Sequence, residues 1–213
     1  MVYSCAYFTS SDGELDEAQA NKLDYLCRKL RLESGERVLD IGCGWGGFAI
    51  YTAQNYGVSV VGITLSLRQA EIARKRIAAA GLNRQCTIIM ADYRDLDGQE
   101  QYDKIVSVGM VEHVGNSRLH LYFRQAHSLL KPGGVFLNHG IASSEGDGRL
   151  GSFAERYVFL DAELVPLHQI ITAAEEGEWE VRDIESLREH YALTLNHWAR
   201  RLEDGHRRVV DLV

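Results

Sequence analysis

Short runs of aliphatic and β-branched residues alternate with amphipathic helix patterns along most of this chain, and this alternation limits the fold more than any other feature. The expected strands are residues 36–44, 58–63, 86–91, 104–109 and 135–141. The expected helices among them are residues 46–56, 66–81 and 117–130. A strand that returns to its sheet through a helix runs parallel to the strand before it. We therefore predict an α/β fold with a doubly wound, mostly parallel sheet that binds ligands at the carboxyl ends of its strands.

Glycines and one serine predict where these elements begin and end. Ser66 is a candidate N-cap, and Gly81 a candidate C-cap, of the helix at 66–81. Gly57 is expected to end the preceding helix, and the KPGG residues 131–134 predict a turn before the fifth strand.

The segments that flank this alternation follow other patterns. Residues 14–32 place leucines at helical spacing, and Gly35 is expected to end that helix. Residues 142–152 are polar and glycine-rich, which is typical of a mobile loop or lid. The remaining patterns predict a helix at 163–178, a strand at 179–187 and a helix at 190–205.

No linker, repeat or low-complexity tract divides the 213 residues, so we expect a single domain. Its expected parts are an N-terminal cap segment and helix (1–34), a cofactor-binding core (35–141), a lid or substrate segment (142–179) and a C-terminal strand and helix (180–213).

Composition excludes several classes of function. The formal net charge is -7, which disfavours long-range attraction to nucleic acid. The four cysteines have neither paired nor regular spacing, so we expect no disulfide framework, no metal site and a reducing, cytoplasmic setting. No signal peptide and no apolar run of transmembrane length is found.

The stretch VLDIGCGWGG places Gly42, Gly44 and Gly47 in a G-x-G-x-x-G pattern at the end of the first strand. One interpretation is a tight strand-to-helix turn. A second is a dinucleotide site, but this needs an acidic residue near the end of the second strand, and VVGITLS has none. A third is S-adenosylmethionine, because LDIGCGWG with Asp40 resembles the first motif of class I methyltransferases.

Two further positions allow both a structural and a binding interpretation. Gln69 stands at capping-box spacing from Ser66, and it is also placed to reach a cofactor ribose. Asp92 and Tyr93 follow the third strand, where such folds hold adenine; alternatively, Asp92 is a turn-capping residue.

An ordered set of motifs resembles the cyclopropane-fatty-acyl-phospholipid synthases and the related mycolic acid cyclopropane synthases. These motifs are YSCAYF, EAQANKLD, VLDIGCGWGG, VVGITLS, VEHVG, LKPGG and EHYALTLNHW, and they run through most of the chain. The resemblance implies a Rossmann-like class I methyltransferase sheet, S-adenosyl-L-methionine as methyl donor and a bound bicarbonate. It also implies a phospholipid or other acyl-chain substrate and transient contact with a membrane, with the protein peripheral at its inner face.

The resemblance also implies roles for individual residues. The expected bicarbonate and catalytic set is Cys5, Glu112, His139, Tyr191 and the backbone of Ile141. The expected cofactor-binding set is Tyr3, Ser4, Asp40, Gly42, Gly44, Thr64, Leu65, Gln69, Asp92 and Tyr93. The implied reaction is methylene transfer to a cis double bond, through a carbocation that bicarbonate deprotonates. Aromatic rings, Tyr122 among the candidates, are expected to stabilise that cation.

The sequence departs from the family in three places. Leu160 and Ala162 stand where the family usually has proline and glycine, which leaves the backbone course of the lid open. We expect this chain to lack the sizeable region that precedes YSC in phospholipid-type members. The sequence up to Val213 offers no final strand for the sheet, so we expect a truncated sheet or a homodimer that completes it.

Three other functions stay open at this stage. They are methyl transfer to an acyl chain without ring closure, methyl transfer to a small molecule, and a binding module without catalysis.

Overall fold

The computed structural model describes residues 2–143 and 162–210, and these fall into two compact units. The core unit comprises residues 27–183, and the terminal unit comprises residues 2–26 and 184–213. We describe the two units separately. The expected loop at 142–152 and the departure at Leu160 lie almost wholly outside the described residues.

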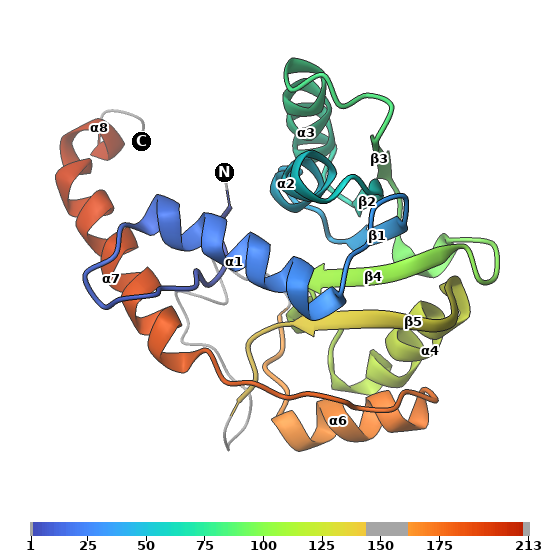
Figure 1. Ribbon diagram of the computed structural model, residues 1–213. Coiled ribbons are helices and arrows are strands. Elements are labelled where there is room, and N and C mark those ends of the chain that lie inside the picture. Colours follow the sequence, from blue (N-terminus) through green and yellow to red (C-terminus); the bar gives the residue numbers. More distant parts are fainter. Residues whose placement is uncertain (1, 144–161, 211–213) are drawn as a thin grey trace. The chain divides into compact units, whose positions relative to one another are not determined.

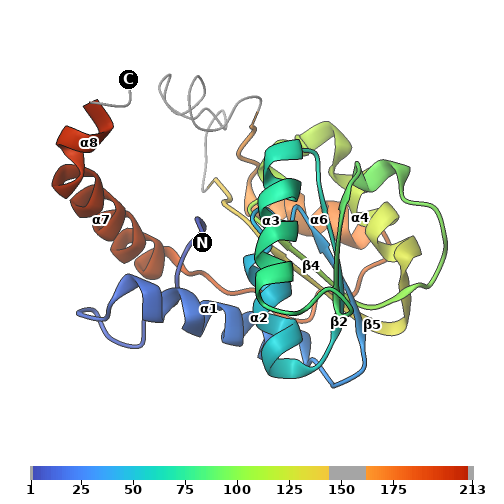
Figure 2. The same cartoon turned by 90° about the horizontal axis from the view of Figure 1, so that it is seen from above.

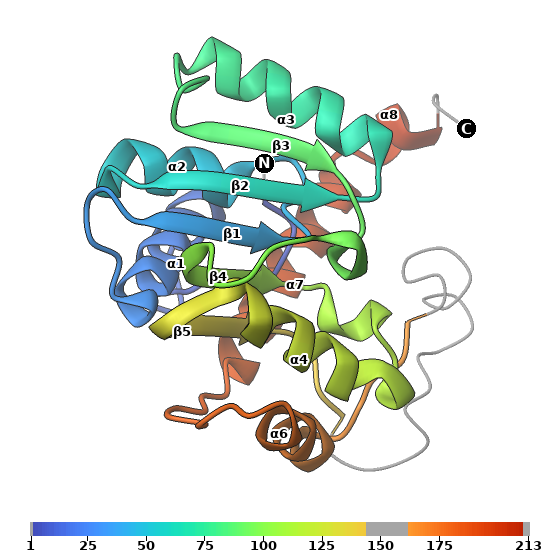
Figure 3. The same ribbon diagram turned by 90° about the vertical axis from the view of Figure 1, so that its right-hand side faces the viewer.

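Five parallel strands form the sheet of the core unit, in the order β3-β2-β1-β4-β5. Their bounds are Arg37–Ile41 (β1), Ser59–Thr64 (β2), Cys86–Met90 (β3), Tyr102–Val108 (β4) and Leu130–His139 (β5). Figure 3 shows the five strands side by side in this order. The chain reverses its direction of travel across the sheet between β1 and β4, and ligands bind at such a switch point. The predicted α/β fold with a parallel sheet is confirmed.

Helices cover both faces of this sheet. Their bounds are Gly47–Tyr56 (α2), Leu67–Ala79 (α3), Leu119–Leu129 (α4) and Leu167–Glu176 (α6). The first two contact β2 and β3, α4 contacts β5, and α6 packs against α4. Figure 2 shows α2 and α3 on one side of the sheet and α4 on the other. Short 3-10 turns follow β3 and β4: η1 (Tyr93–Asp95), η2 (Val111–His113) and η3 (Asn116–Arg118).

The predicted helix ends are largely confirmed. The side chain of Ser66 caps α3 by accepting a hydrogen bond from the backbone N–H of Gln69. Gly57 ends α2 in the left-handed conformation, with φ 67°. Ala80 rather than Gly81 is the C-cap of α3, and Gly81 follows it with φ 71°.

Two predicted elements differ from the structure. Residues 180–186 form no strand; they are exposed and irregular, because no sheet edge pairs with them in the described part of the chain. The predicted turn at 131–134 lies inside β5 as a bulge, since Tyr102 pairs with Leu130 and Lys104 pairs with Val135.

The terminal unit contains most of α1 (Leu15–Leu30), together with α7 (Arg188–Asp204) and α8 (His206–Val210). Figure 1 shows these elements in blue and red. Ala6, Phe8, Leu15 and Ala18 form its buried cluster, against which Leu193 and Trp198 pack. No helix among the described residues is long and apolar enough to cross a membrane.

Candidate functional site

The glycine loop, residues 42–47, turns sharply from β1 into α2. Gly42, Gly44 and Gly46 have φ of 81°, 52° and 74°, a left-handed conformation that favours glycine. The backbone N–H groups of Gly42 and Cys43 both donate to the carbonyl of Ile63, at 3.0 and 2.9 Å. The loop is therefore seated directly on the carboxyl end of β2.

The fit between this loop and β2 leaves no room for a side chain at Gly62. A Cβ there would lie 2.8 Å from Cβ of Cys43 and 2.8 Å from Cδ1 of Ile88. Burial, reinforced by the Asp40 carboxylate, raises the pKa of the Cys43 thiol far above its ordinary value. Cys43 is thus a packing residue, not a nucleophile.

Helix α3 holds the other side of the loop. A Cβ at Gly46 would lie 3.1 Å from Cβ of Ala73, so the loop backbone packs closely on the helix. Nη1 of Arg76 donates to the carbonyl of Trp45 at 2.6 Å. Arg76 is not among the residues predicted from the sequence, although its spacing of seven residues from Gln69, two helical turns, places both on the same face of α3.

The cofactor candidates on β1 and β2 lie beside the loop. Asp40 is buried on β1 and pairs in register with Gly62. Thr64 is buried at the end of β2, and its hydroxyl donates to Oε1 of Gln69 at 2.8 Å. The backbone of Gln69 contributes to the cap of α3, while its side chain is held at the carboxyl end of β2. Leu65 follows with 73% of its surface exposed.

Asp92 acts as a cap, as one of its two interpretations predicted. Its Oδ1 accepts from both N–H and Nε of Arg94, each at 2.9 Å, and the guanidinium lowers the pKa of the carboxyl. Tyr93 is half-buried and packs edge-on against Tyr122, with ring centroids 5.4 Å apart. Both residues follow β3, as predicted.

Glu112 lies in the 3-10 turn after β4, and only 4% of its surface is exposed. Its Oε1 accepts from the backbone N–H of Ile141 at 2.8 Å. Its Oε2 is buried and has no hydrogen-bond partner among the described residues. Burial raises the pKa of this carboxyl. A buried carboxylate oxygen without a partner is costly, and such an atom points to a ligand.

His139 and Ile141 belong to the same end of the sheet. His139 is the last residue of β5, it pairs in register with Val108, and its carbonyl accepts from Gly109 at 2.8 Å. Ile141 follows two residues later. Its N–H is engaged by Glu112, so it orients that carboxylate.

The Glu112 turn adjoins the glycine loop. A Cβ at Gly42 would lie only 3.0 Å from Cγ of Met110, which precedes the turn. The fully buried Tyr122 donates its hydroxyl to Oδ1 of Asn138 at 3.0 Å. The switch point between β1 and β4 is therefore flanked by the backbone loop and by the buried carboxylate.

The other candidates lie in the terminal unit. Sγ of Cys5 is 3.8 Å from the carbonyl of Leu187, just before α7, and burial raises the pKa of this thiol. Oγ of Ser4 accepts from Nζ of Lys22 at 2.8 Å, and Lys22 is 1% exposed. Tyr3 is 59% exposed.

Tyr191, on α7, packs edge-on against Trp198 at 6.3 Å between ring centroids. Each unit thus groups its own candidates. Glu112, His139 and Ile141 are brought together in the core unit, while Cys5 lies near the start of the helix that carries Tyr191.

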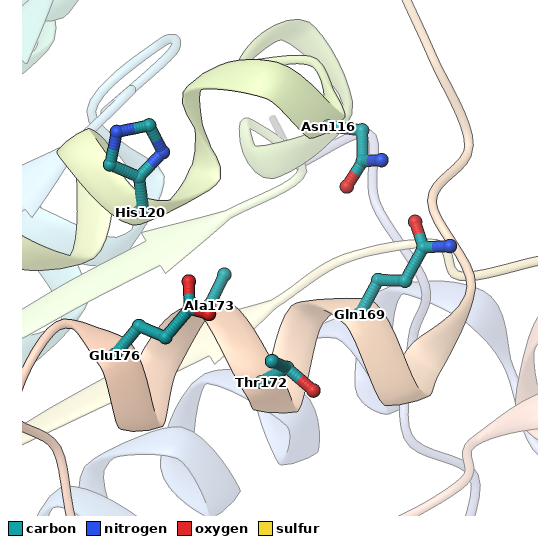
Figure 4. Close-up of a pocket in the computed structure, with 6 residues that line it drawn as sticks. All are labelled: Asn116, His120, Gln169, Thr172, Ala173 and Glu176. Atoms are coloured by element: carbon teal, nitrogen blue, oxygen red, sulfur yellow. The ribbon is translucent and has the colours of Figure 1, made fainter.

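A groove of about 210 Å³ lies elsewhere on the core unit, between α6 and the segment that enters α4. Asn116, His120, Gln169, Thr172, Ala173 and Glu176 line it (Figure 4). None of the predicted site residues is among them. No group of three or more His, Cys, Asp and Glu side chains within 2–143 and 162–210 is arranged to hold a metal ion.

Comparisons with known proteins identify the family and the fold. The model of the mycolic acid cyclopropane synthetase family matches residues 1–213. A probable fatty acid methyltransferase of Pseudomonas putida is 47% identical over 218 residues, which cover 100% of this chain and 55% of that protein. The cyclopropane-fatty-acyl-phospholipid synthase of Escherichia coli K12 is 44% identical over 201 residues, 94% of this chain and 50% of that protein. The chain thus spans about half the length of these two relatives.

A solved structure, mycolic acid cyclopropane synthase CmaA1 complexed with SAH and CTAB, superimposes with a TM-score of 0.90. It is 33% identical, and the match covers 99% of this chain and 78% of that one. The fold of the core unit is therefore that of a class I methyltransferase, and the chain belongs to the mycolic acid cyclopropane synthetase family.

Proposed function

We propose that the protein transfers a methylene group from S-adenosyl-L-methionine to the cis double bond of an unsaturated acyl chain of a phospholipid, giving a cyclopropane fatty acid. Family membership supports the reaction class. The observation that carries the proposal is the buried Glu112 carboxylate, which has one oxygen fixed by Ile141 and the other without a partner among the described residues.

The residues beside β1 and β2 fit the methyl donor. Gly42 and Gly44 carry no side chain that would block close approach of the amino-acid part of the donor to the loop, and the buried Asp40 lies near the end of β1. Gln69, held by Thr64, would bind the ribose, with Leu65 beside it. Asp92 and Tyr93 would hold the adenine, and Tyr3 and Ser4 would cover the methionine end.

The nucleophile in this reaction is the alkene, which is weak, and the reaction also needs a base that removes a proton. The π electrons of the alkene form a bond to the sulfonium methyl carbon while its bond to sulfur breaks, which leaves a carbocation on the acyl chain. Removal of one proton from the transferred methyl group lets its carbon close the ring. The products are the cyclopropane, S-adenosylhomocysteine and a proton.

In the core unit, the residues at the carboxyl ends of β4 and β5 would bind a small base. Bound bicarbonate would supply that base, and Oε2 of Glu112 would accept a hydrogen bond from its hydroxyl. The raised pKa makes Glu112 a stronger proton acceptor than an ordinary carboxylate. The family resemblance assigns the remaining bicarbonate-binding roles to His139, Cys5 and Tyr191.

We further propose that the acyl chain is reached by transient contact with the inner face of a membrane, by a protein that is otherwise cytoplasmic and forms a homodimer. Residues 142–179 would act as the lid over the substrate, within a single methyltransferase domain. Flotation with phospholipid vesicles and sedimentation of the free protein test these points.

Product analysis tests the reaction. The protein is incubated with S-adenosylmethionine and vesicles of a phospholipid that carries one cis-monoenoic chain, and the fatty acids are analysed by mass spectrometry. Gain of one methylene unit with loss of the alkene supports cyclopropane formation. The same gain with the alkene retained or shifted supports methyl branching, the second candidate, which is favoured by the name of the Pseudomonas putida relative. No transfer to the acyl chain contradicts both.

A further inference from the structure

Residues 163–166, directly before α6, are bonded to both loops that carry the Glu112 site. The backbone N–H of Glu163 donates to the carbonyl of Glu112 at 2.8 Å. The carbonyl of Val165 accepts from the N–H of Ser143 at 3.1 Å, two residues beyond Ile141. Val165 is 3% exposed and packs in the main core, so this segment is anchored.

The side chain of Glu163 makes a second bond to the same turn. Its Oε2 accepts from the backbone N–H of Asn116 at 2.9 Å. Gly115, with φ 76°, allows this approach, because a Cβ there would lie 3.2 Å from Oε2. Glu163 therefore contacts the turn at Glu112 with its backbone and at Asn116 with its carboxylate.

The turn has short-range hydrogen bonds of its own: the N–H groups of His113, Val114 and Arg118 donate to carbonyls three residues earlier. It consists of the 3-10 turns at Val111–His113 and Asn116–Arg118, separated by Gly115. Short 3-10 turns have poorer hydrogen-bond geometry than α-helix. Glu163 adds two bonds from outside the turn, to the Glu112 carbonyl and the Asn116 N–H, and so helps to fix the backbone that carries the Glu112 carboxylate.

We propose that Glu163 is a positioning residue, which holds the Glu112 carboxylate against Ile141 in the geometry that catalysis requires. The inference rests on the function proposed above for Glu112. It concerns an exposed side chain that is not among the predicted catalytic or cofactor-binding residues. A displacement of about 1 Å at a reacting group can reduce turnover about 100-fold, so a contact of this kind affects the rate.

The test compares three variants of the full chain. Glu163→Ala removes the acceptor for Asn116, Glu163→Gln keeps an acceptor oxygen, and Glu175→Ala is the matched control, an exposed glutamate on α6. We expect kcat to fall about tenfold or more in Glu163→Ala, with the Kd for S-adenosylmethionine unchanged by calorimetry. We expect Glu163→Gln to recover most of that loss and Glu175→Ala to match the parent protein.

Amide exchange measured by NMR keeps this test separate from the proposed function. Exchange of the Asn116 and Ile141 amides is expected to speed up in Glu163→Ala and to return toward the parent rates in Glu163→Gln. If the parent protein transfers no methyl group to acyl chains, the proposed function fails, while the exchange rates still test the positioning. A role in stability alone would lower the unfolding temperature without changing kcat or Ile141 exchange, and that result overturns the inference.

Discussion

Two halves of the strand-end region of the core unit are built by different means. At β1 and β2 the glycine loop is fixed by backbone bonds to Ile63, by close packing on α3 and by Arg76. At β4 and β5 the principal feature is one side chain, Glu112, whose buried carboxylate accepts a hydrogen bond from the backbone N–H of Ile141. We call these the cofactor half and the reaction half.

This difference separates binding from chemistry. Many small contacts determine the shape of the cofactor half, so each single substitution there is expected to raise the Kd for the cofactor by a modest factor. In the reaction half the Glu112 carboxylate is proposed to be essential to the chemistry, so removing its charge is expected to abolish product while cofactor binding survives. The following predictions test that separation, in order of decreasing effect.

Glu112→Gln is expected to lower the rate of acyl-chain methyl transfer about 10²- to 10⁴-fold, because a neutral amide cannot accept a proton from the hydroxyl of the bound base. The Kd for S-adenosylmethionine, measured by calorimetry, is expected to stay within about twofold, since the cofactor half is untouched. Loss of cofactor binding in this variant would show that Glu112 also serves binding, and it would contradict the separation of binding from chemistry.

The pH dependence of the reaction half follows from the raised pKa of Glu112. Activity requires its carboxylate form, so kcat/KM is expected to fall about tenfold per pH unit at low pH. The midpoint of this fall is expected to lie above the pKa of an ordinary glutamate, which is about 4.3.

Because folding raises the pKa of Glu112, the folded state binds this proton more tightly than the unfolded state does. The contribution of Glu112 to stability is therefore greatest below the unfolded pKa and declines as pH rises through the folded one. A pH–rate profile with no such acid limb would contradict this role.

Gly42→Ala is expected to raise the Kd for S-adenosylmethionine about tenfold, because its Cβ would press on Met110 and the φ of 81° disfavours alanine. Gly81→Ala is the matched control. Gly81 also has a positive φ, 71°, but nothing lies within 4 Å of the Cβ that alanine would add. Both variants are expected to lose about 1 kcal/mol of unfolding free energy, and only the first to lose affinity. Equal affinities would show that the loop does not contact the cofactor.

Thr64→Val is expected to give the smallest effect, a roughly threefold rise in the Kd for S-adenosylmethionine. It removes one hydrogen bond that holds the Gln69 side chain, a contribution of about 1 kcal/mol or less. Thr172→Val, at an exposed position on α6, is the control. Equilibrium binding by calorimetry distinguishes the two, and an unchanged Kd in Thr64→Val would place the Gln69 side chain outside the cofactor site.

The sequence predicted the cofactor half more fully than the reaction half. Strand periodicity and the Ser66 cap are local signals, and the structure confirms both. Of the predicted glycines, Gly42 and Gly44 have positive φ, but the third such residue is Gly46, and Gly47 begins α2. The predicted strand at 179–187 failed because alternation of apolar residues cannot show whether a neighbouring strand is available.

The contacts around Glu112 were not predictable from local pattern. Its bond to Ile141 joins residues 29 positions apart, and that of Glu163 to Asn116 joins residues 47 apart. Only the family resemblance pointed to Glu112. Nothing in the sequence pointed to Glu163 as a support, and the only signal for Arg76 was its helical spacing from Gln69. Such residues become visible when the fold brings distant loops to the same sheet edge.

The most direct test of the account follows the transferred carbon with S-adenosylmethionine that carries a trideuterated methyl group. If a base in the reaction half removes one deuteron before ring closure, the acyl product retains two deuterium atoms and has lost its alkene. We predict that product for the parent protein, and its loss in Glu112→Gln. A product that retains all three deuterium atoms would show that the methyl group is never deprotonated, and it would contradict the assignment of cyclopropane formation.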